Sequence, residues 1–155
     1  MKRTFLLPIL LIFPLFTPIQ ALGSHGMVTV NSDHSVPVTA DRLESTLKDK
    51  GMTIFSRIDH AAGAAEVGET LRPTILIIFG NPRVGTALMK CGQTAGIDLP
   101  LKILIWEDEA GVVRLSYNDP RYIADRHGIT GCGQILEKIS GALRGFAEKA
   151  IGNEP

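Results

Sequence analysis

The stretch that most constrains the fold is Thr74–Asp108, TILIIFGNPRVGTALMKCGQTAGIDLPLKILIWED. It opens with an apolar run over 74–79 that has the length of a strand and shows no alternation, which predicts a strand covered on both faces. Asn81 is a strong helix N-cap, and Pro82 suits the first helical position because its missing N–H costs nothing there. The stretch therefore predicts a strand, a tight turn and a helix over 82–93 at the centre of the domain.

The rest of the chain predicts further strands and helices in alternation. Strands are expected over 27–30, 52–58, 101–106 and 112–117, and helices over 39–50, 60–67, 120–127 and 134–150. The last helix carries the clearest amphipathic stripe and is expected to cover one face of a sheet. Local hairpins and short helices favour an α+β domain with a mainly antiparallel sheet over a doubly wound parallel one.

Two local predictions concern the first helix and the second strand. Thr39 is expected to cap the first helix. In the strand over 52–58, Ile54 and Ile58 are expected to face one side of the sheet, with Phe55 and Arg57 on the other.

The first 21 residues are expected to be a signal peptide and not part of the domain. A short basic start, an apolar run and a small residue at the exit are typical of secretory signals. A membrane anchor is the alternative, but three prolines interrupt the run and it is shorter than the roughly 20 apolar residues of a spanning helix. We therefore expect a single domain over 22–152 in a periplasmic or secreted protein, with no stable membrane insertion after cleavage.

The charge balance excludes one class of partner. Loss of Lys2 and Arg3 with the signal peptide leaves 14 basic residues against 16 acidic ones. A nucleic-acid-binding domain needs a basic surface to neutralise phosphates, so nucleic acid is not expected as a partner.

Cys91 and Cys132 leave two alternatives open. They suit an oxidising compartment, where a disulfide between them would stabilise the fold by roughly 4 kcal/mol on the chain-entropy model. Cys91 also falls at helical spacing from Val84 and Leu88, so two separately buried thiols are the other alternative.

Two histidines are candidates for chemistry. Asp59 precedes His60 directly, and it could orient a proton-transferring or metal-binding imidazole or simply cap the following helix. His127 lies at the end of a helix that Asp119 begins. If His60 and His127 met in space with one of these aspartates, they would form a metal or acid–base site.

The turn over 80–86 is a candidate anion site. Asn81 begins a helix whose first N–H groups are free, and Arg83 adds a positive charge. The turn lacks the spacing of a nucleotide-binding loop, and capping explains Asn81 without a ligand. No other motif in the chain assigns a cofactor.

Several longer motifs resemble a known family. They are Arg57–Gly63, Phe79–Pro82 with Gly85-Thr86, Asp98–Leu101, Trp106–Asp108, Tyr117–Pro120 and Arg126–Gly128. Together they resemble the bacterial domain-of-unknown-function family 302 (DUF302) over about 28–129. The resemblance implies a curved antiparallel sheet packed against helices, similar to the TATA-binding protein, and a homodimer. It implies no activity, and the two cysteines depart from the family pattern, which we interpret as an adaptation to export.

Two hypotheses for the function follow. The first is a non-enzymatic module that binds a small molecule, an anion or a partner in a concave pocket between sheet and helices. The second is a metal-dependent or acid–base enzyme that uses His60 and His127 with Asp59 or Asp119.

Overall fold

The computed structural model describes residues 26–152, so the predicted signal peptide lies outside the described residues. The elements follow in the order β1 (Met27–Asn31), α1 (Val36–Asp49), β2 (Thr53–Asp59), α2 (His60–Glu66), β3 (Thr74–Gly80), α3 (Pro82–Cys91), the 3-10 helix η1 (Gln93–Ile97), β4 (Leu101–Glu107), β5 (Val113–Asn118), α4 (Pro120–Arg126) and α5 (Gly133–Ile151). The predicted order of strands and helices is confirmed, and η1 is an addition that the sequence did not predict.

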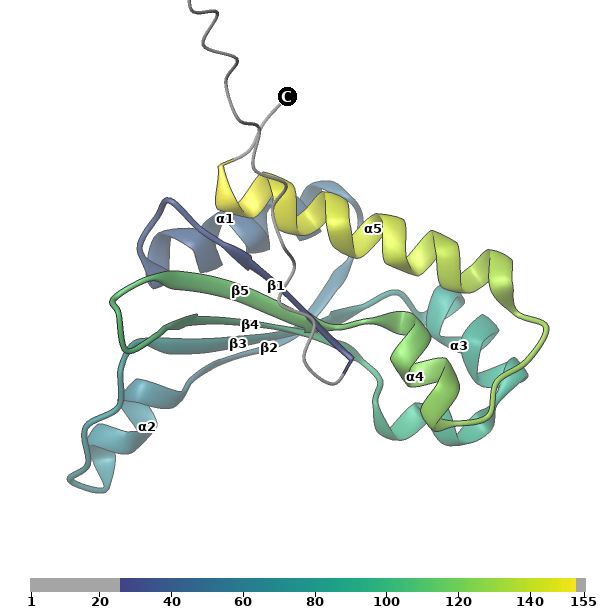
Figure 1. Cartoon of the computed structure of the whole chain (residues 1–155), viewed down its shortest axis with the longest axis horizontal. Helices are drawn as coiled ribbons and strands as arrows, with labels where there is room; N and C mark the ends of the chain where they lie inside the picture. Colours follow the sequence, from purple (N-terminus) through teal and green to yellow (C-terminus); the bar gives the residue numbers. More distant parts are fainter. Residues whose placement is uncertain (1–25, 153–155) are drawn as a thin grey trace, which may run out of the picture.

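The five strands form one antiparallel sheet in the order β1-β5-β4-β3-β2. The predicted α+β class is therefore confirmed. Helices α1 and α5 lie side by side over one face of the sheet (Figure 1). The core lies between these two helices and the sheet, and its largest fully buried side chains include Leu43, Leu47, Ile77, Phe79, Ile103, Ile105, Leu115 and Leu143.

Within residues 26–152, strand β3 is fully buried on one face, under α1 and α5, which corrects the prediction that both faces are covered. Ile75, Ile77 and Phe79 point into the core and are buried, whereas Leu76 and Ile78 are only partly buried. Because α1 and α5 cover the same face, only alternate residues of β3 are fully buried. The sequence does not show this alternation, since every residue over 75–79 is apolar.

The prediction for the faces of β2 was also wrong. Ile54 lies opposite Phe79 on the helix-covered face, but Ile58 lies opposite Leu76 on the other face. The cause is a β-bulge, an extra residue that shifts the register between Ile54 and Ser56. A period-two pattern read across a bulge places every later side chain on the wrong face.

The start of α1 corrects a third prediction. The helix begins at Val36 after Ser35, with Pro37 in its first turn, where proline is tolerated. Thr39 is therefore not the cap. Its buried hydroxyl lies 2.7 Å from that of Ser32 and donates to the Ser35 carbonyl at 2.9 Å.

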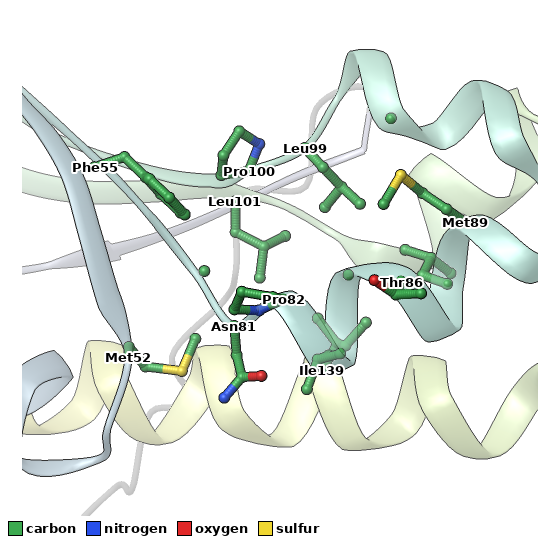
Figure 2. Close-up of a pocket in the computed structure, with 15 residues that line it drawn as sticks. Met52, Phe55, Asn81, Pro82, Thr86, Met89, Leu99, Pro100, Leu101 and Ile139 are labelled. Carbon is green, nitrogen blue, oxygen red and sulfur yellow. The ribbon is translucent and has the colours of Figure 1, made fainter.

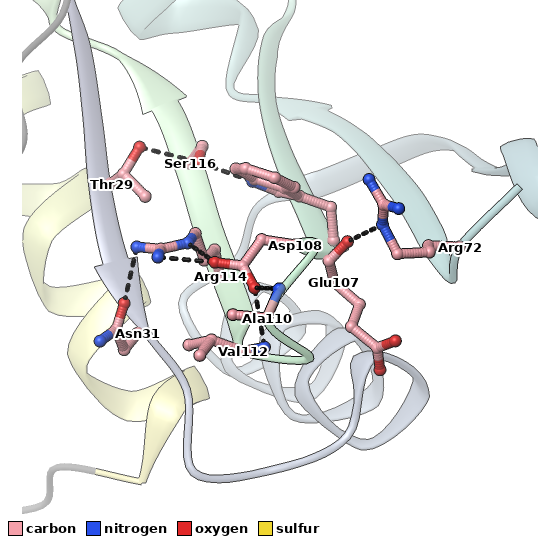
Figure 3. A network of polar contacts seen from close by, with 10 residues as sticks. Thr29, Asn31, Arg72, Glu107, Asp108, Ala110, Val112, Arg114 and Ser116 are labelled. Atoms are coloured by element: carbon pink, nitrogen blue, oxygen red, sulfur yellow. Dashed lines mark hydrogen bonds and ion pairs between the residues drawn. The ribbon is translucent and has the colours of Figure 1, made fainter.

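A polar network joins β1, β4 and β5 on the face opposite α1 and α5 (Figure 3). Ser116 is buried there and bonds to Thr29 and to the indole N–H of Trp106. Asp108, at the β4–β5 turn, accepts from the Val112 N–H and pairs with Arg114. The Val112 N–H bond is the main cause of a lowered pKa of Asp108, and Arg114 lowers it further.

Candidate functional site

A pocket of about 350 Å³ opens where the sheet ends and α3 begins. Its volume lies near the lower limit for small-molecule sites. The end of β3 and the start of β4 form one side, α3 and η1 form a second, and α5 contributes Ile139 (Figure 2). The lining is mostly apolar and includes Met52, Phe55, Val84, Gly85, Leu88, Met89, Leu99, Pro100, Leu101 and Ile139.

Asn81 and Thr86 contribute polar side chains to this lining. The side-chain oxygen of Asn81 accepts the N–H of Arg83 at 3.0 Å, so the predicted capping role is confirmed. The oxygen is thereby occupied, while the amide nitrogen of Asn81 makes no hydrogen bond within residues 26–152. An amide nitrogen carries two donors, so Asn81 keeps two N–H groups that can bond to a ligand or to water.

Arg83 lies outside this pocket. It lines a shallow depression on the neighbouring side of α3, together with Pro82, Thr86, Ala87 and Lys90. The capping interaction uses only the backbone N–H of Arg83, so its exposed guanidinium is not bound by Asn81. Anion binding at Arg83 stays a prediction.

Asp59 and His60 lie at the start of α2, which projects from the sheet away from α3 and α4 (Figure 1). The Asp59 carboxylate accepts the Ala62 N–H at 3.0 Å, which is an N-cap, and His60 is exposed. The capping interpretation of Asp59 is therefore confirmed.

His127 makes a different pair from those considered in the sequence. Its Nε2 lies 2.6 Å from the Asp98 carboxylate and its Nδ1 lies 3.0 Å from the Thr94 hydroxyl. The His127 side chain is 8% exposed. Arg126 also contacts Asp98, at 3.1 Å. Both ring nitrogens are thus occupied, and the imidazole connects the end of α4 to η1 and the loop after it.

The structure does not bring His60 and His127 together. They lie at opposite ends of the sheet, on α2 and after α4 (Figure 1). Asp119 caps α4 by accepting the Arg121 N–H at 2.8 Å. Among residues 26–152, no group of three or more His, Cys, Asp or Glu side chains could hold a metal ion. The shared site of the second hypothesis is therefore not formed.

Cys91 and Cys132 form a disulfide, with Cα atoms 6.4 Å apart. It joins the last residue of α3 to the residue before α5. The disulfide alternative is thus the one that the structure contains, and it connects two elements that line the pocket.

Sequence reasoning missed Asp98 and Thr94 as partners of His127, and it missed Phe55 and Met52 as pocket residues. Asp98 stood in a motif of the family resemblance, which was a usable signal. Phe55 gave none, because its position depends on the bulge in β2.

Comparisons with known proteins agree with the fold. The family described as "Domain of unknown function DUF302" matches residues 28–146. The chain belongs to the DUF302 family. An uncharacterized DUF302 protein from Bacillus stearothermophilus has a crystal structure with a TM-score of 0.74, 18% identity, and coverage of 82% of this chain and 99% of that chain. This similarity establishes the shared fold.

Curated relatives come from Brucella. The protein named fluoride-specific ion channel FluC 1 of Brucella suis biovar 1 (strain 1330) is 48% identical over 138 residues, a match that covers 81% of this DUF302 chain and 54% of that protein. Its namesake from Brucella abortus biovar 1 (strain 9-941) is also 48% identical and is covered over 51%. The chain spans about half the length of these relatives. Across residues 26–152, no helix combines the length and the hydropathy that a membrane crossing requires.

Proposed function

We propose that this DUF302 domain binds a small apolar molecule in the pocket between the sheet and α3. The observation that carries the proposal is the cavity of about 350 Å³ with its mostly apolar lining. Such a lining with few polar groups is typical of small-ligand sites, where apolar contact gives affinity and the polar groups orient the ligand. Neither His60 nor His127 lines this cavity, so the proposal is binding without catalysis.

We propose that Asn81 orients the ligand. Its two amide N–H groups have no acceptor among residues 26–152, so they can donate to a carbonyl oxygen on an otherwise apolar molecule. Acetophenone, a neutral ring with one carbonyl group, is a suitable probe. The name of the Brucella relatives contributes no ligand here, because the match covers about half of each protein.

Substitution at Gly85 tests the site. Gly85 lies on α3 in the pocket lining, and a Cβ there would meet the Leu99 side chain at 3.8 Å, an ordinary contact. Gly85→Phe should therefore fill the cavity without backbone strain and abolish acetophenone binding measured by NMR titration. Gly141→Phe is the matched control, since Gly141 is an exposed position on α5 with nothing within 4 Å of a Cβ. Equal binding by both variants would refute the proposal.

Asn81→Asp separates capping from binding. Aspartate caps helices as well as asparagine does, so the stability of α3 should be unchanged. It offers no N–H to a carbonyl, and the loss of one hydrogen bond should weaken acetophenone binding about fivefold. Unchanged affinity would mean that Asn81 does not contact the ligand.

Export and a homodimer also belong to the proposal. Export is supported by the basic and apolar start of the chain and by the disulfide, which persists in oxidising compartments. Mass spectrometry of the protein from its own host should find the chain without residues 1–21 and without free thiols.

Sedimentation equilibrium should give twice the mass of the mature chain, and a monomer mass would exclude the homodimer.

The anion hypothesis concerns a separate place, the depression beside Arg83 and Lys90. If it is right, Arg83→Ala should abolish phosphate binding and leave acetophenone binding unchanged. Phosphate binding that survives this change would remove Arg83 as its site.

A further inference from the structure

Phe55 is held at the mouth of the pocket by the bulge in β2. In the ladder with β3, Ile54 pairs with Phe79 and Ser56 with Ile78, so Phe55 is the extra residue with no partner across the strand. β2 is an edge strand, and bulges at sheet edges often redirect a side chain next to a site. The bulge thus places the Phe55 ring in the pocket lining.

The ring lies beside the end of β3, next to Gly80 and Pro100. A Cβ on Gly80 would sit 3.5 Å from the Phe55 ring and 3.6 Å from the Cβ of Pro100. Phe55 and Pro100 thus both lie close to Gly80 where β3 ends, and Figure 2 shows them at the same end of the pocket. Phe55 nevertheless remains 54% exposed. A ring exposed to this degree in a binding site is available for a ligand to cover.

We infer that Phe55 determines ligand specificity by stacking on a flat aromatic ring, so that the pocket prefers aromatic over saturated rings of the same size. The inference rests on the proposed function and adds the shape of the ligand to it. Aromatic pairs gain energy from offset-stacked and edge-to-face geometries beyond the apolar area that they bury, and a puckered ring cannot gain this term. Leucine at position 55 would keep apolar contact but lose the aromatic face.

The test compares two ketones of similar size, acetophenone and cyclohexyl methyl ketone, whose carbonyl groups offer the same acceptor to Asn81. The wild-type protein should bind acetophenone more tightly. Phe55→Leu should weaken acetophenone binding about three- to tenfold and change cyclohexyl methyl ketone binding less than twofold. Thermal unfolding verifies that the variant folds.

Tyr122→Leu is the matched control, because Tyr122 is another exposed aromatic residue, 40% exposed on α4, and it is absent from the pocket lining. It should leave both affinities unchanged. If Phe55→Leu weakens the binding of both ketones equally, or of neither, Phe55 does not determine specificity, while the binding proposal stands. Failure of the wild-type protein to bind either ketone would instead overturn the binding site itself.

Discussion

The two sides of the pocket are stabilised in different ways. One side belongs to the core region, formed by β3, β4 and β5 under α1 and α5, where rows of apolar side chains are fully buried. The other side is the α3–η1 wall, residues 82–97, in which only Leu88 and Ala95 are buried. The disulfide at Cys91 and the bonds of His127 to Thr94 and Asp98 connect this wall to the rest of the domain.

The wall therefore depends on cross-links, whereas the core region depends on the burial of apolar side chains. A short segment with few buried apolar contacts is expected to open locally at a lower free energy than the core. The pocket lies along the boundary between the two, so we expect its wall side to open more readily than its core side.

The largest expected effect is in the core region. Phe79 is fully buried and packs edge-to-face on Phe146, with ring centroids 6.0 Å apart. Phe79→Ala should lower the free energy of unfolding by about 3–5 kcal/mol, because it removes burial and leaves a cavity. Urea unfolding followed by circular dichroism measures this loss. A loss below about 1 kcal/mol would contradict the assignment of the core.

Removal of the disulfide should cause the next largest loss of stability, and this loss should be concentrated in the wall. Cys91 and Cys132 are 41 residues apart, and their cross-link should contribute about 2–4 kcal/mol. The double variant to serine should speed amide hydrogen exchange in the wall more than in β3 and β4. Uniform acceleration over the whole domain would show that the wall and the core region open together.

The bonds of His127 should contribute less. His127→Ala leaves the Asp98 carboxylate without its imidazole partner, although Arg126 remains beside it. The expected loss is about 1–3 kcal/mol, again with faster exchange confined to the wall and the end of α4. If exchange in η1 does not change, His127 does not hold the wall.

The smallest expected change is in the pH dependence of stability. The pKa of Asp108 is lowered, so its carboxylate stabilises the fold above the ordinary pKa of aspartate, and this contribution is lost as pH falls through the lowered value. Asp108→Asn should therefore reduce the difference in thermal stability between pH 7 and the acid range below about pH 4. Amide hydrogen exchange in the wall should be the same in Asp108→Asn as in the wild-type protein. An identical pH dependence in both proteins would exclude this role of Asp108.

The sequence predicted much of the fold, because the caps and apolar patterns are local signals. Asn81-Pro82, Asp59 and Asp119-Pro120 all begin helices where they were expected to. The bulge at Phe55 was not predictable in this way, since only the ladder with β3 reveals the extra residue.

The candidate site was predicted only in part for the same reason. The turn at Asn81 was identified as a site candidate, but its apolar partners come from distant elements, such as Met52 and Ile139. The pairing of His127 with Asp98 depends on how η1 packs against α4, and no spacing in the sequence specifies that contact.

Ligand binding in this pocket can be measured by a methyl NMR titration of the wild-type protein with acetophenone. Binding in the pocket predicts saturable shifts of the methyl groups of Val84, Leu99 and Ile139, which line it. Methyl groups of Leu76 and Leu104, on the sheet face opposite α1 and α5, should not shift. Shifts confined to Leu76 and Leu104, or no saturable shift at all, would contradict the claim that this pocket binds the ligand.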